Sequence, residues 1–109
     1  MLKQSILVML MLQLPFSAKG QEFSPYLKKE HRNASGVLPY RILYPENFDP
    51  GVKYPLLLFL HGAGERGTDN EKQLVHGAGL FLKPDIRRQY PAVVVFPQCP
   101  REDSWVNLR

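Results

Sequence analysis

Two nearly continuous apolar runs stand out along the chain. The first, residues 54–60, ends abruptly at the sequence His-Gly-Ala-Gly, and the second, residues 92–96, is rich in β-branched side chains and lies between two prolines. Neither run alternates with polar positions, which is typical of strands buried on both faces of a parallel sheet. Roughly thirty residues separate the runs, enough for a crossover connection that carries a helix.

The region before the first run has the pattern of a β-hairpin. Residues 26–32 and 37–44 are the two predicted strands, and the sequence Asn-Ala-Ser-Gly at residues 33–36 provides the turn. Pro39 lies inside the second strand and has no N–H to donate, so it predicts an edge strand or a bulge there.

The segment between the apolar runs carries helix signals. Thr68 followed by Glu71 fits a capping box, which predicts a helix over residues 69–75 that ends at the glycines of residues 76–79. Residues 84–90 predict a second helical turn with proline at its first position. The order of hairpin, buried strand, helix and buried strand indicates the opening of an α/β fold with an incomplete sheet.

The first twenty residues have the pattern of a signal peptide. Lys3 precedes an apolar run over residues 6–14, and Ala18 and Gly20 occupy the small-residue positions before a cut at Gln21. A membrane-spanning helix needs about 20 apolar residues, roughly twice this run. We therefore expect that residues 1–20 are removed and that the protein is secreted or periplasmic, without a stable membrane anchor.

Charge and cysteine content exclude some partners. The chain has 14 basic and 10 acidic side chains, and removal of Lys3 and Lys19 leaves 12 basic ones and a net charge of +2. The basic residues form no stripe with aromatics, which argues against nucleic acid as a partner. Cys99 is the only cysteine, so it is either a small buried hydrophobe or the partner of a cysteine further downstream.

Residues 61–67 are the candidate for chemistry. They follow a predicted buried strand, and in an open α/β sheet ligands bind at the carboxyl ends of strands. The glycines allow a tight turn that presents backbone N–H groups, and fixed donors of this kind stabilise an oxyanion. The same letters recur at residues 76–79, but they follow a predicted helix, so we interpret them as a helix end and turn.

A family resemblance extends this interpretation. Residues 38–41, 54–70 and 96–100, in that order, resemble a secreted bacterial branch of the α/β-hydrolases described as predicted peptidases, phospholipase/carboxylesterases or dienelactone-hydrolase-like proteins. This branch is similar to feruloyl and acetyl-xylan esterases. The resemblance covers about residues 36–107 and implies an α/β-hydrolase fold over residues 21–109, represented by its N-terminal part.

The resemblance also implies roles for the loop. The backbone amide of Ala63, with that of Gly64 as a second candidate, would form part of an oxyanion hole, and His61 and Gly62 would shape the loop. Glu65 and Arg66 would either contact substrate or pair with each other. The implied reaction is hydrolysis of a carboxylic ester or a peptide through an acyl-enzyme, without a cofactor or a metal. The substrate would be a small-molecule or polysaccharide-linked ester.

The nucleophile of such an enzyme is missing from the sequence. No serine has glycine two residues before and two residues after it, so no Gly-x-Ser-x-Gly elbow exists. A set made of Ser104, Asp103 and either His61 or His76 would place the nucleophile in a loop with no helix behind it. We therefore expect the chain to stop before the nucleophile, the acid and the catalytic histidine, and to be inactive alone.

Two other classes of function remain to be weighed. Residues 62–67 match Gly-x-Gly-x-x-Gly, but the acidic ribose partner expected about 20 residues on is not evident, which argues against a dinucleotide enzyme. The alternative outside catalysis is a secreted binding module or a degenerate hydrolase relative. A Gly-x-Ser-x-Gly encoded in frame downstream favours the enzyme, and a stop codon after residue 109 favours the alternative.

Overall fold

The computed structural model describes residues 22–106. The predicted signal peptide, residues 1–20, and its cut before Gln21 lie outside the described residues. Within these residues no helix has the length and apolar character needed to cross a membrane.

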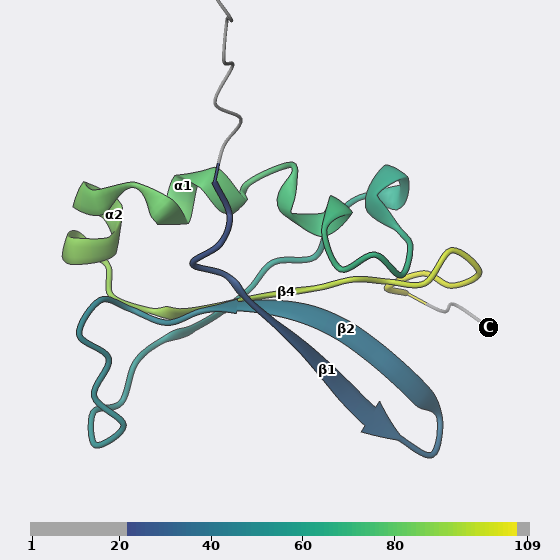
Figure 1. Cartoon of the computed structure of the whole chain (residues 1–109), viewed down its shortest axis with the longest axis horizontal. Helices are drawn as coiled ribbons and strands as arrows, with labels where there is room; N and C mark the ends of the chain where they lie inside the picture. Colours follow the sequence, from purple (N-terminus) through teal and green to yellow (C-terminus); the bar gives the residue numbers. More distant parts are fainter. Residues whose placement is uncertain (1–21, 107–109) are drawn as a thin grey trace, which may run out of the picture.

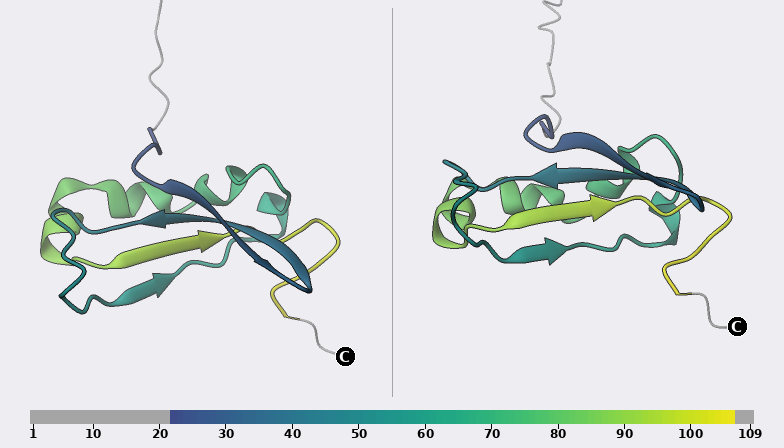
Figure 2. Two further views of the ribbon diagram at one scale, coloured as in Figure 1. Left: turned by 60° about the horizontal axis from the view of Figure 1, so that its bottom comes forward. Right: turned by 90° about the horizontal axis from the view of Figure 1, so that it is seen from below.

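The described residues form a four-stranded mixed sheet with helical segments on one face (Figures 1 and 2). The strand order is β1-β2-β4-β3, so the last strand in the sequence lies inside the sheet. Strand β2 is antiparallel to both of its neighbours, and β3 is parallel to β4. The strands are β1 (Leu27–Asn33), β2 (Gly36–Leu43), β3 (Leu56–Leu58) and β4 (Val93–Pro97), and the helices are η1 (Ala63–Glu65), η2 (Lys72–Leu74), α1 (Ala78–Leu82) and α2 (Pro84–Gln89).

The predicted hairpin is confirmed. Strands β1 and β2 pair from Leu27 opposite Ile42 to Asn33 opposite Gly36, which leaves a two-residue turn. The Asn33 side chain closes this turn by accepting a hydrogen bond from the Ser35 N–H at 2.9 Å. Gly36 has a φ of +137°, a conformation that glycine adopts far more readily than other residues.

The prediction that Pro39 marks an edge strand or a bulge is wrong. β2 lies between β1 and β4, and its pairing with β4 begins at Tyr40 opposite Pro97. The Pro39 carbonyl accepts from the Gln98 N–H at 2.9 Å. In an antiparallel pair the N–H and C=O of one residue face the same neighbour, so the missing donor of Pro39 faces β4 where the ladder ends. A proline at the end of the β2–β4 pairing therefore removes no hydrogen bond from the middle of the ladder.

The two apolar runs form parallel strands, as predicted, but the first is shorter and more exposed than expected. Residues 54–60 contribute only the three-residue β3, at an edge of the sheet. Leu56 and Leu58 are 70% and 58% exposed, because alternate side chains point away from the helices. Burial on both faces is therefore wrong for β3 among the described residues, whereas Val94 and Phe96 of β4 are buried.

The core lies between the sheet and the helical segments. Phe96 is fully buried, and its ring contacts those of Tyr26, Phe59 and Phe81 at centroid distances of 5.5, 4.6 and 6.2 Å. The Tyr26 hydroxyl donates to the Ala78 carbonyl at 2.7 Å, which joins the chain before β1 to the start of α1. Burial raises the pKa of the Tyr26 phenol, with a smaller opposing effect from Arg87.

The predicted helix over residues 69–75 is wrong. The Asp69 carboxylate, and not Thr68, accepts from the Glu71 and Lys72 N–H groups at 3.1 and 3.3 Å, and only the short helix η2 follows. Gly77 has a φ of +93°, which ends that segment and precedes α1. Residues 76 and 77 lie in a turn, as interpreted from the sequence, but Ala78 and Gly79 already belong to α1, so the interpretation of this stretch as the end of a helix is wrong. The predicted helix with proline at its first position is confirmed as α2.

Candidate active site

The glycine-containing loop lies at the carboxyl end of β3, beside the carboxyl end of β4. Gly62 has an extended backbone, and Ala63 to Glu65 form the single turn η1, in which the Glu65 N–H bonds the Gly62 carbonyl at 3.3 Å. The first N–H groups of a helical turn have no partner within it. Among the described residues the Ala63 and Gly64 N–H groups bond no other group, and both residues are exposed. The loop therefore presents two free amide donors to an open space.

His61 connects the loop to the chain after β4. Its side chain is buried, with Nε2 accepting from the Cys99 N–H at 2.9 Å and Nδ1 2.6 Å from the Gly62 carbonyl. An Nε2 that accepts leaves the ring proton on Nδ1, which then donates to the Gly62 carbonyl. Both ring nitrogens of His61 are thus occupied by backbone groups, which are the contacts of a residue that shapes the loop.

Trp105 contacts His61 through its ring and its N–H group. Its Nε1–H donates to the His61 carbonyl at 2.9 Å, and the two rings meet edge to face at 5.0 Å. A hollow of about 120 Å³ lies beside these rings, bordered by Gly62, Ala63 and Cys99. Burial raises the pKa of the Cys99 thiol, with Asp103 adding to the effect and Arg66 opposing it. The hollow is therefore bordered both by the Trp105 ring and by Ala63.

Of the two roles considered for Glu65 and Arg66, contact with substrate or an ion pair with each other, the ion pair is not formed in the described residues. The Glu65 carboxylate lies 3.3 Å from His76 Nε2, before α1. Arg66 instead donates from Nε to the Ala63 carbonyl and from Nη1 to the Asp103 carbonyl, each at 3.0 Å. The two side chains therefore connect the loop to separate segments, the turn before α1 and the chain after β4, by contacts that sequence spacing did not indicate.

Ser104 does not form the triad that its neighbours in sequence would allow. Its Oγ–H donates to the Val106 carbonyl at 2.6 Å, and its N–H donates to the Asp103 carboxylate at 2.8 Å. Neither bond involves a histidine, and both nitrogens of His61 are already occupied. Nor do three His, Cys, Asp or Glu side chains gather as a metal site within residues 22–106.

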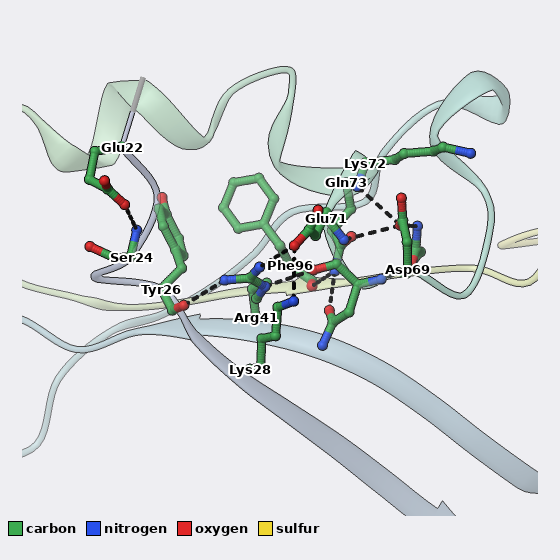
Figure 3. A network of polar contacts seen from close by, with 12 residues as sticks. Glu22, Ser24, Tyr26, Lys28, Arg41, Asp69, Glu71, Lys72, Gln73 and Phe96 are labelled. Atoms are coloured by element: carbon green, nitrogen blue, oxygen red, sulfur yellow. Dashed lines mark hydrogen bonds and ion pairs between the residues drawn. The ribbon is translucent and has the colours of Figure 1, made fainter. Parts of the chain in front are cut away.

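A buried polar network lies behind the loop (Figure 3), and the sequence reasoning missed it. Arg41 of β2 is 7% exposed and donates to the Asn70 and Tyr26 carbonyls at 2.7 and 2.8 Å. Burial lowers the pKa of Arg41, and the nearby charges of Glu71 and Asp69 oppose this. The Asn70 amide group donates to the Tyr40 carbonyl at 3.2 Å, so the chain after the loop is anchored to β2.

A larger groove lies at the opposite end of the sheet. It measures about 840 Å³ and lies between the amino ends of β3 and β4 and the helices α1 and α2, lined by apolar residues such as Leu56, Phe81 and Ala92. Ligands of open α/β sheets bind at the carboxyl ends of the strands. We therefore place the candidate site at the smaller hollow, which Ala63 borders.

Comparisons with known proteins bear on the fold and on the general class of the protein. No family model and no curated protein matches the chain. Among solved structures, the chain is similar to a thermostable esterase, with 39% sequence identity and a TM-score of 0.70 over 78% of this chain. The match covers 24% of that esterase's chain, so this chain spans about a quarter of its length. The likeness supports an esterase-like hydrolase fold, and the mixed four-stranded sheet fits part of an α/β-hydrolase fold.

Proposed function

We propose that this chain carries the oxyanion loop of a serine hydrolase that cleaves carboxylic esters through an acyl-enzyme. The observation that carries the proposal is the pair of free N–H groups, on Ala63 and Gly64, at the carboxyl end of β3. The similarity to a thermostable esterase supports the same reaction class.

The proposed chemistry assigns a distinct part to each loop residue. A serine attacks the ester carbonyl, and the negative charge that develops on the carbonyl oxygen is held by the Ala63 N–H, with Gly64 as the neighbouring donor. His61 fixes the direction of these amides, because its ring joins the loop backbone to Cys99. Loss of one such donor typically lowers the rate about 10²–10³-fold. The reaction needs no cofactor.

We further propose that the nucleophile, the acid and the catalytic histidine lie downstream in a longer protein. The sequence holds no Gly-x-Ser-x-Gly, and the matched part is 24% of the esterase's chain. The finer assignments belong to the same proposal. They are export with loss of residues 1–20, a secreted or periplasmic location, membership of the secreted peptidase and esterase branch, and an ester or peptide substrate.

The test compares the full product of the gene with the 109-residue chain. We expect the full product to hydrolyse p-nitrophenyl acetate and to lose this activity after reaction with a fluorophosphonate. Peptide mapping should place the phosphonate on a serine in a Gly-x-Ser-x-Gly segment. The 109-residue chain should show no turnover above buffer. Turnover by that chain that disappears in Ser104→Ala would contradict the proposal, and so would a full product without esterase or peptidase activity.

A further inference from the structure

Gln98 is a buried side chain that makes three hydrogen bonds near the loop. It follows β4 directly and has no exposed surface. Its Oε1 accepts from the Asn70 N–H at 2.7 Å, while its Nε2 donates to the Glu65 carbonyl at 3.1 Å and to the Asp69 carboxylate at 2.8 Å. A side-chain amide has two N–H donors, and both are used here.

These three bonds reach both ends of residues 65–70, the segment that follows the glycines of the loop. Glu65 is the last residue of η1, which begins at Ala63, and Asn70 is the point where the chain is anchored to Arg41. Residue 99 adds two more bonds, from the Gly67 N–H to the Cys99 carbonyl at 3.0 Å and from the Cys99 N–H to His61. The loop is thus tied to the carboxyl end of β4 before, within and after η1.

We infer that Gln98 is a positioning residue for the reaction, fixing the distance of the Ala63 and Gly64 amides from the reacting carbonyl. The inference rests on the proposed function of the loop. Oxyanion donors act only when they lie about 2.7–3.1 Å from the charge that develops. A misplacement of about 1 Å can cost on the order of 10²-fold in rate. Gln98 touches no substrate and acts through the Glu65 carbonyl and η1.

The chemistry at this position requires an amide. Glutamate has the same shape but would place a second carboxylate beside Asp69 and would remove both donors. Methionine is close in size and offers no hydrogen bond, so it would leave the Asn70 N–H and the Glu65 carbonyl without partners. Both changes should loosen η1 without altering the surface that faces the substrate.

Gln73 provides a matched control. It is also fully buried, but its Nε2 donates to the Asn70 side chain and the Phe96 carbonyl, and none of its bonds reaches residues 61–69. Gln73→Met should therefore lower stability and leave kcat per folded molecule nearly unchanged.

The experiment uses the full product of the gene with p-nitrophenyl acetate as substrate. We expect Gln98→Met and Gln98→Glu to lower kcat about 10–100-fold while KM changes by less than about 3-fold, because the donors act in the transition state. Hydrogen exchange of residues 62–67 should become faster in both variants and not in Gln73→Met. An unchanged kcat in folded Gln98→Met would overturn the inference, with or without faster exchange.

A paired substitution keeps the test valid if the single variants fold poorly. In Asp69→Asn with Gln98→Glu, the two neighbouring carboxylates of the single variant become one carboxylate and one amide. The charge repulsion is thereby removed, while the side-chain oxygen at residue 69 can still accept from the Glu71 and Lys72 N–H groups. We expect kcat to recover at least about 5-fold over Gln98→Glu alone, whereas no recovery would count against the inference. An unsubstituted full gene product without turnover would refute the proposed function, and the role of Gln98 with it. Active parent with an insensitive residue 98 would refute the positioning role alone.

Discussion

Replacing Gly77 with alanine tests how the start of α1 sits on the sheet. Gly77 has a φ of +93°, and a Cβ built there would lie 2.8 Å from two ring carbons of Phe59. That ring is partly buried and stacks on the fully buried Phe96 at 4.6 Å, so a shift of the ring disturbs the packing against the core. Alanine at this position therefore meets both a backbone penalty and a steric one.

The two penalties can be estimated separately. A residue other than glycine held at such a φ costs on the order of 1–3 kcal/mol. Forcing extra atoms into a filled core costs about 1–3 kcal/mol more. Gly77→Ala should therefore lower the free energy of unfolding by about 2–6 kcal/mol. Gly36→Ala isolates the first penalty, because Gly36 has a φ of +137° and open space around its Cβ.

The assay is urea denaturation of the full gene product followed by circular dichroism. Gly77→Ala should lose more stability than Gly36→Ala, and the excess should disappear when Phe59→Leu removes the ring atoms that the new methyl would meet. Equal losses in Gly77→Ala and Gly36→Ala would refute the contact between the start of α1 and the ring of Phe59.

Three further predictions concern export, the loop and Asp69. Intact-mass analysis of the exported protein should give Gln21, or its cyclised form, as the first residue, and a soluble exported product that retains Met1 would exclude a cleaved signal peptide. Gly64→Val should fold normally, because Gly64 has no positive φ and a Cβ built there meets no other atom. Its kcat should nevertheless fall about 10²-fold, because the valine side chain adds bulk beside the reacting carbonyl. A folded variant with full kcat would contradict the oxyanion role of the loop. Burial alone would raise the pKa of Asp69, but hydrogen bonds from Gln98 and from the Glu71 and Lys72 N–H groups outweigh it and hold this pKa below the ordinary 3.8. Because the pKa of Asp69 is lower in the folded state, the ionised carboxylate stabilises the fold above pH 3.8, and this stabilisation is lost as the pH falls through the folded pKa. The difference in Tm between the unsubstituted protein and Asp69→Asn should therefore shrink on acidification, and a difference that is constant with pH would contradict this.

The sheet could be predicted from the sequence where local pattern and long-range pairing agree. The hairpin has turn residues at its tip, and β4 has β-branched residues between prolines, so both were predicted within a few residues. The prediction of a helix over residues 69–75 is wrong because two side-chain acceptors compete there for the same backbone N–H groups. Asp69 takes the N–H groups that a Thr68 cap would take, and the φ of Gly77 then redirects the chain. Sequence spacing cannot decide which acceptor wins.

The candidate site was predicted as a loop, and its supports were not. The position of residues 61–64 follows from a strand that ends in glycines. The hydrogen-bond partners of Glu65, Arg66 and Gln98 come from segments up to 37 residues away in the sequence. These segments meet only because of the order of the strands in the sheet. One signal was available for Gln98, a polar side chain that directly follows a buried strand. Such a group must find partners when it is buried.

The strand order also governs when the sheet can form during synthesis. The hairpin joins residues close in sequence and can pair as soon as β2 has left the ribosome. β3 has no partner until β4 is made, because β4 enters between β2 and β3. Until then the apolar residues 54–60 are an unpaired strand, which is the kind of segment that aggregates or binds a chaperone. Within the described part of the fold, β3 therefore stays unpaired throughout the translation of residues 61–97, which contain the loop proposed to hold the oxyanion.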